Sequence, residues 1–99
     1  MPDPRRGVAW EFIISLVDTA NRPSFRVNPT IAAGDFKISK DYGTLANVGT
    51  LPVVAPAGGV GVRFQLSATE MTADYIQIIG IDVAGNEWDN VFIYLTTGP

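Results

Sequence analysis

Residues 75–95 read YIQIIGIDVAGNEWDNVFIYL, and this stretch decides the fold class. Two runs rich in isoleucine, valine and aromatic residues, 75–82 and 87–96, flank the turn-forming residues 83–86. β-Branched and aromatic side chains favour strands, while glycine and asparagine favour the turn that joins two strands. The stretch therefore predicts an antiparallel hairpin.

Shorter runs of the same character recur toward the N-terminus, with turn residues about every ten positions, as in antiparallel sandwiches. The residues from Lys40 to Gly43 predict a tight hairpin turn. The spacing of Ser67 and Glu70 matches a capping box and predicts one helical turn at 68–72. The sequence thus predicts an all-β fold, a single antiparallel β-sandwich of about seven strands. The remaining extended segments are expected at 9–18, 25–27, 35–39, 44–48, 53–54 and 62–66.

The length of 99 residues allows one domain, which we place at 9–97. Residues 1–8 come before it and contain two prolines and the cations Arg5 and Arg6. Proline holds the backbone extended, and so short a basic segment adds nothing to a core. We expect an extended N-terminal arm that docks on a partner through Arg5 and Arg6.

The chain contains no cysteine and no histidine. Disulfides, zinc sites and catalysis by imidazole are therefore excluded, and the serines and threonines lack the usual activating base. We expect no enzyme, no cofactor and no metal site. Asp82, Glu87 and Asp89 crowd one hairpin end with Asn86, but their spacing matches no calcium loop and indicates a polar hairpin tip.

The charge pattern bears on the choice of partner. A net charge of −3 argues against binding to nucleic acid, and no apolar run approaches the roughly 20 residues that a bilayer requires. Residues 1–40 carry six cations and four anions, whereas residues 41–99 carry one cation and six anions. Scattered solvated charge explains this imbalance, and so do contacts between complementary patches.

Three strands are apolar on both faces, namely those that contain residues 12–14, 76–81 and 91–95. One face of each sheet in a lone sandwich should meet water. Either loops cover these strands, or their outer faces meet another chain. The low share of charged residues, 17%, favours an assembly surface.

Three aromatic residues are further candidates for partner contacts. Trp10 lies on the same strand face as Phe12, and Trp88 begins the last strand, so burial in the core is the competing interpretation for both. Tyr42 occupies a turn, where a large aromatic side chain has no packing reason to be. Carbohydrate stacking is a further possible role for flat aromatic faces, centred on Tyr42 and Trp88. The residues that supply such faces are Trp10, Tyr42, Tyr75, Trp88 and Tyr94.

Two segments carry a resemblance to a known class of proteins. Residues 35–47 read DFKISKDYGTLAN, and residues 66–74 read LSATEMTAD. They resemble a pattern in small virion proteins of tailed bacteriophages, which carry an ISKDGG-x-x-x-N hairpin and later an LTxxEMNAD turn. The resemblance extends over about residues 10–97 and includes the opening strand SLVD; the chain departs from it at Tyr42 and at Thr72.

The resemblance implies an Ig-like β-sandwich and a structural role in a phage virion. We expect a head decoration, or cement, protein on the capsid surface, assembled in the cytoplasm of the bacterial host. Its partners would be the major capsid protein, copies of itself as a homo-oligomer, or both, with no nucleic acid and no membrane. The alternatives are a tail, neck or fibre-base component and a carbohydrate-binding host-attachment module.

Overall fold

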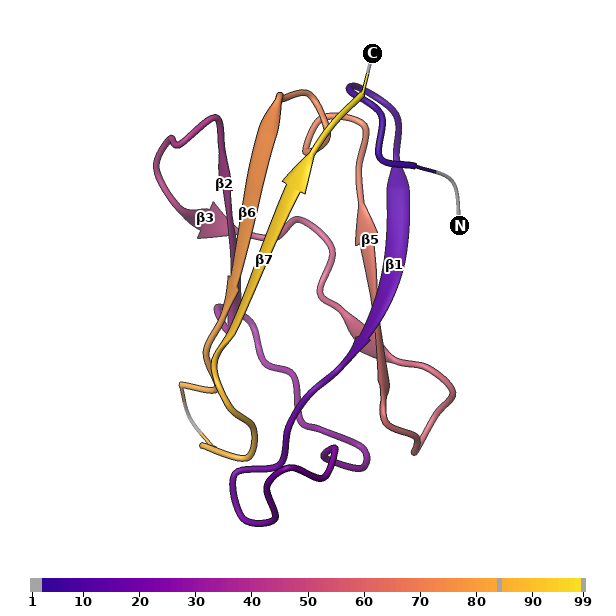
Figure 1. The fold of residues 1–99 in the computed structure, drawn as a ribbon, viewed down its shortest axis with the longest axis vertical. Helices are drawn as coiled ribbons and strands as arrows, with labels where there is room; N and C mark the ends of the chain where they lie inside the picture. The colour runs from indigo at the N-terminus through magenta and orange to yellow at the C-terminus, as the bar shows by residue number, and fades with distance from the viewer. Residues whose placement is uncertain (1–2, 84, 99) are drawn as a thin grey trace.

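Two antiparallel β-sheets form the fold of this computed structural model, which describes residues 3–83 and 85–98 (Figure 1). The three-stranded sheet has the order β1-β5-β4, with β1 at Trp10–Ser15, β5 at Gly61–Leu66 and β4 at Val53–Val54. The four-stranded sheet has the order β3-β2-β6-β7, with β3 at Ala46–Asn47, β2 at Phe36–Lys40, β6 at Tyr75–Gly80 and β7 at Val91–Thr96. The predicted all-β sandwich of about seven strands is confirmed, but the extended segment expected at 25–27 forms no strand and only an isolated bridge from Phe25 to Val17.

An aromatic column joins the two sheets at the centre of the core. Phe12 of β1 stacks on Phe64 of β5 with ring centroids 4.8 Å apart. Phe64 meets the edge of the Phe36 ring from the other sheet at 4.8 Å, and Phe36 stacks on Trp88 at 5.2 Å. These contacts are buried, so the inward half of each alternating strand supplies the core.

The β6–β7 hairpin is confirmed, but its strands are shorter than expected. β6 ends at Gly80 and β7 begins only at Val91, because residues 87–89 pair instead with 17–19. These residues belong to the segments 16–35, 81–83 and 85–90 at the bottom of Figure 1, which we call the lower loops. The predicted turn at 83–86 includes residue 84, which lies outside the described residues. β1 is also shorter than the extended segment expected at 9–18. It ends at Ser15, before the isolated bridges that Val17 and Asp18 form.

The helical turn expected at 68–72 is not confirmed. The capping box does form, because the Glu70 carboxylate accepts a hydrogen bond from the Ser67 N–H (3.0 Å) and the Ser67 hydroxyl accepts one from the Glu70 N–H (3.1 Å). Met71 is buried in the core, and β6 begins soon after it, so the segment remains a turn. The described part of the chain contains no helix long and apolar enough to cross a membrane.

The first described residues of the expected arm lie against the C-terminal end of the domain. The Arg6 N–H donates to the Gly98 carbonyl (2.9 Å), and the Gly98 N–H donates to the Pro4 carbonyl (3.0 Å). The Gly7 N–H donates to Met71 (3.0 Å). Residues 3–8 thus turn back along the C-terminal end of β7, because the backbone finds hydrogen-bond partners there. Met1 and Pro2 lie outside the described residues.

Close packing of Gly80 against the Phe36 ring sets the register between β2 and β6. Gly80 pairs with Phe36, and a Cβ at Gly80 would collide with the Phe36 ring. We expect Gly80→Ala to lower the free energy of unfolding by about 2–3 kcal/mol, as overpacking does. Urea denaturation measures this change. The matched control is Gly49→Ala, whose Cβ would lie at an ordinary 3.6 Å from Glu70, and an equal loss in both variants would contradict the packing argument.

Candidate functional site

The outer face of the four-stranded sheet carries aromatic and aliphatic side chains in the open. The pairing register sets Lys37, Ile79 and Phe92 in one row across the sheet. Gln77 and Tyr94 lie in the next row, and Phe92 is 62% exposed. We call this surface the aromatic face; its members are Tyr42, Tyr75, Ile79, Phe92 and Tyr94, with Lys37 and Gln77 as its polar members.

All three tyrosines of the chain gather at one end of the aromatic face. The ring centroid of Tyr75 lies 5.4 Å from that of Tyr42 and 6.4 Å from that of Tyr94. The hydroxyl groups of Tyr42 and Tyr94 form a hydrogen bond of 2.9 Å. Tyr42 therefore does pack within its own chain, which corrects the expectation that its turn offers no packing, yet it stays 64% exposed.

The β2–β3 hairpin turn holds Tyr42 in this position. The Gly43 N–H donates to the Lys40 carbonyl (2.9 Å), and both central residues have positive φ, 49° at Asp41 and 62° at Tyr42. Positive φ at both central positions is typical of the type I′ turn of tight hairpins, as the sequence predicts here. The Asp41 carboxylate accepts hydrogen bonds from the N–H groups of Asp74 (3.0 Å) and Tyr75 (3.1 Å). The turn is thus tied to the start of β6.

A hollow of about 250 Å³ continues the aromatic face toward the opposite end of the sheet. Ile79 and Lys37 form part of its wall, and the buried Asp35 lies at its inner side. The Asp35 carboxylate is already occupied, because it accepts hydrogen bonds from the N–H groups of Ala32 (2.9 Å) and Val83 (3.4 Å). The exposed apolar residues of the hollow are Leu45, Ile81 and Val83.

The aromatic face is almost free of charge. Among the outward-facing strand residues that the structure describes in β2, β3, β6 and β7, Lys37 alone is charged. The hydrogen bond with Tyr42 raises the pKa of Tyr94 to about 12, with burial as a further cause. The Tyr94 hydroxyl therefore remains neutral at physiological pH.

The sequence-predicted contact residues do not lie together. Trp88 is only 1% exposed, and its indole N–H donates to the Thr30 carbonyl (3.2 Å), so it is a core residue and not a contact residue. Trp10 is half-buried, with its ring 5.1 Å from that of Phe12. Arg5 and Arg6 are exposed, and Arg6 forms an ion pair with Asp74 at 3.4 Å.

Sequence reasoning missed Phe92 as a candidate and considered Tyr75 and Tyr94 only as faces for carbohydrate stacking. The available signal was the alternation within 75–80 and 91–96, which places these three side chains opposite the buried residues of their strands. Only the strand pairing shows that they share one surface with Tyr42.

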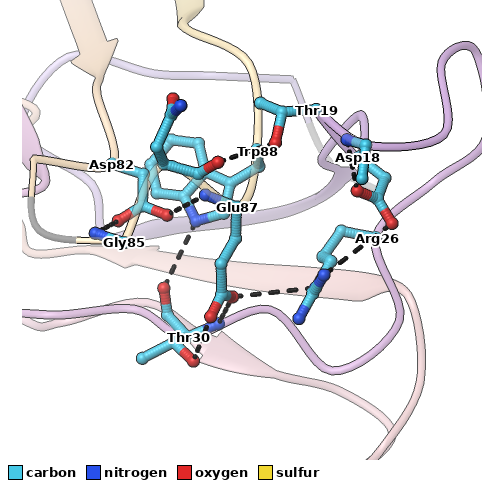
Figure 2. Close-up of polar contacts among 10 residues, drawn as sticks. Asp18, Thr19, Arg26, Thr30, Asp82, Gly85, Glu87 and Trp88 are labelled. Atoms are coloured by element: carbon cyan, nitrogen blue, oxygen red, sulfur yellow. Dashed lines mark hydrogen bonds and ion pairs between the residues drawn. The ribbon is translucent and has the colours of Figure 1, made fainter.

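The carboxylates of Asp82 and Glu87 accept hydrogen bonds from backbone N–H groups of the lower loops (Figure 2). The Asp82 carboxylate accepts hydrogen bonds from the N–H groups of Gly85 (3.1 Å) and Glu87 (2.6 Å). The Glu87 carboxylate accepts from the Thr30 N–H (3.1 Å) and lies 3.7 Å from Arg26 Nε. No group of three or more acidic residues within 3–83 and 85–98 is arranged to hold a metal ion.

Comparisons with known proteins identify no relative. No protein-family model matches the chain, and neither the curated proteins nor the solved structures contain a match. The inference of function therefore rests on the aromatic face and on the resemblance in the sequence.

The hydroxyl pair of Tyr42 and Tyr94 can be tested by titration. The pKa of Tyr94 is raised above the ordinary 10, so this pair stabilises the fold fully below pH 10 and loses its effect as the pH rises toward 12. We expect Tyr42→Phe to lower the pKa of Tyr94 toward 10, as measured by NMR of the tyrosine ring carbons. Tyr75→Phe is the control, because it keeps the hydroxyl pair, and an unchanged Tyr94 pKa in Tyr42→Phe would contradict the hydrogen bond.

Proposed function

We propose that this chain is a structural protein whose aromatic face is covered by protein in an assembled particle. The aromatic face is the observation that carries the proposal. Its four exposed rings present roughly 400 Å² of aromatic surface, taking ~200 Å² for each fully exposed ring. Large apolar patches on soluble proteins mark interaction sites. No catalytic group is assigned in this role.

The tyrosine end of the face suits a contact with another protein. Its rings are held by stacking, by the Tyr42–Tyr94 hydroxyl pair and by the turn at Asp41. Rigid aromatic groups lose little conformational freedom on binding, which makes them effective anchors at interfaces. The hydroxyl groups still offer hydrogen bonds at the rim.

The choice of particle rests on the resemblance of residues 35–47 and 66–74 to small virion proteins of tailed bacteriophages. We propose a head decoration, or cement, protein that binds between major capsid subunits and stabilises the shell. Many identical copies would add their contacts through avidity. The competing role within the same class is a tail, neck or fibre-base component.

A carbohydrate-binding module is the second candidate, and the three exposed tyrosines on one face favour it. Sugar rings bind against free aromatic faces. Here Tyr75 stacks with both other tyrosines, and the expected second aromatic, Trp88, is buried. The tyrosine rings thus stack on one another while they remain partly exposed, and the burial of Trp88 removes the second aromatic, which favours the protein partner.

The copy number in purified virions tests the proposed role. We expect quantitative mass spectrometry of particles from the phage that encodes this chain to give about one copy per major capsid subunit, or one third of that. A decoration protein covers the whole shell, which is the reason for the high ratio. The count of the major capsid protein in the same sample is the internal control.

A handful of copies per particle would indicate a tail or neck component and contradict the decoration role. Complete absence from washed particles, together with binding of the free chain to host polysaccharide, would contradict the structural role and favour the second candidate.

A further inference from the structure

We propose that the partner covering the aromatic face is a second copy of this chain, related by a two-fold axis that runs parallel to β6, between the two stacked sheets. This inference rests on the proposed function, because it names the chain that covers the face. The outer faces of the two four-stranded sheets would then pack against each other, outside the core of each copy.

The layout of the face is complementary to itself under this symmetry. β6 lies between β2 and β7 in the sheet, so the axis at β6 carries β2 of one copy over β7 of the other. The outward cation of β2, Lys37, then faces the exposed rings that β7 presents, Phe92 and Tyr94. A lysine ammonium over an aromatic ring is a favourable contact that strengthens when water is excluded.

The same symmetry keeps the like charges of the two copies apart. The two copies of Lys37 lie on opposite sides of the axis, more than about 10 Å apart, given strand spacings of ~4.8 Å and sheet spacings of ~10 Å. Ile79 and Gln77 of β6 lie near the axis, where they meet the same two residues of the second copy. The amides of Gln77 can pair there, since each offers both a donor and an acceptor.

The exposed apolar area approaches the size of a standard interface. The four aromatic residues, together with the exposed Leu45, Ile81 and Val83 beside the hollow, supply roughly 600 Å² of apolar surface, against ~800 Å² per partner in a standard interface. The polar members of the face supply the remainder.

The outer face of the other sheet provides the contrast. There Arg63 forms an ion pair with Glu11 at 3.2 Å, beside Ile13, which is 57% exposed. Ile13 thus matches Phe92 in exposure but lacks an aromatic surround, which makes it the control position.

Sedimentation equilibrium of the purified full chain tests the proposal. We expect a dimer that dissociates on dilution, and we expect Phe92→Lys to raise its dissociation constant at least about 30-fold, as the loss of an interface hot spot does. Ile13→Lys should leave the dissociation constant unchanged. Circular dichroism melts of both variants separate loss of the dimer from loss of the fold.

Lys37 tests the symmetry itself. Lys37→Arg should keep the dimer, and Lys37→Glu should weaken it, because a carboxylate over a ring face is unfavourable. A dimer that tolerates Lys37→Glu would overturn the two-fold arrangement.

A chain that stays monomeric at every concentration, or a dimer lost in Ile13→Lys but not in Phe92→Lys, would overturn the inference. The copy number in virions is measured independently, so either failure leaves the proposed structural role to be decided by that count.

Discussion

The register of β6 against β2 and β7 decides which side chains enter the core and which face solvent. Its side chains alternate, so one register sends Ile76 and Ile78 into the core and leaves Tyr75 and Ile79 outside. A slip by one residue would exchange the two faces. Gly80 holds this register, because only a residue without a side chain fits against the Phe36 ring. The core and the aromatic face are therefore fixed by the same hydrogen-bonded ladder.

Folding requires the inward-facing side chains of these strands but not the outward-facing ones. The core closes through Phe36, Phe64 and Trp88, whereas Phe92 remains in water on an edge strand that contains no charge. Exposed apolar edge strands invite association, and proteins that must stay apart usually place charges on them. The arrangement of β7 is consistent with the proposed partner. The ordered tyrosine cluster fits the same role, because its rings are already fixed before a partner arrives.

Local pattern in the sequence predicts the strands and the hairpin turn at Asp41 and Tyr42, since both depend on neighbouring residues. The features that the sequence did not predict depend on distant ones. Tyr42 meets Tyr94 from 52 positions away, and Arg6 is held by Gly98 at the opposite end of the chain. For Trp88 the sequence left burial and a partner contact as alternatives, and the structure places its ring on Phe36 in the core.

The most direct measurement is hydroxyl-radical footprinting of the chain, free at high dilution and bound in the assembled particle. Every tyrosine of the protein lies on the aromatic face, so tyrosine oxidation reports on that surface alone. Coverage by protein predicts strong protection of the tyrosines and Phe92 in the particle, with the exposed Phe25 of the lower loops as the internal reference. Equal oxidation of the tyrosines in both states would contradict an aromatic face built for assembly.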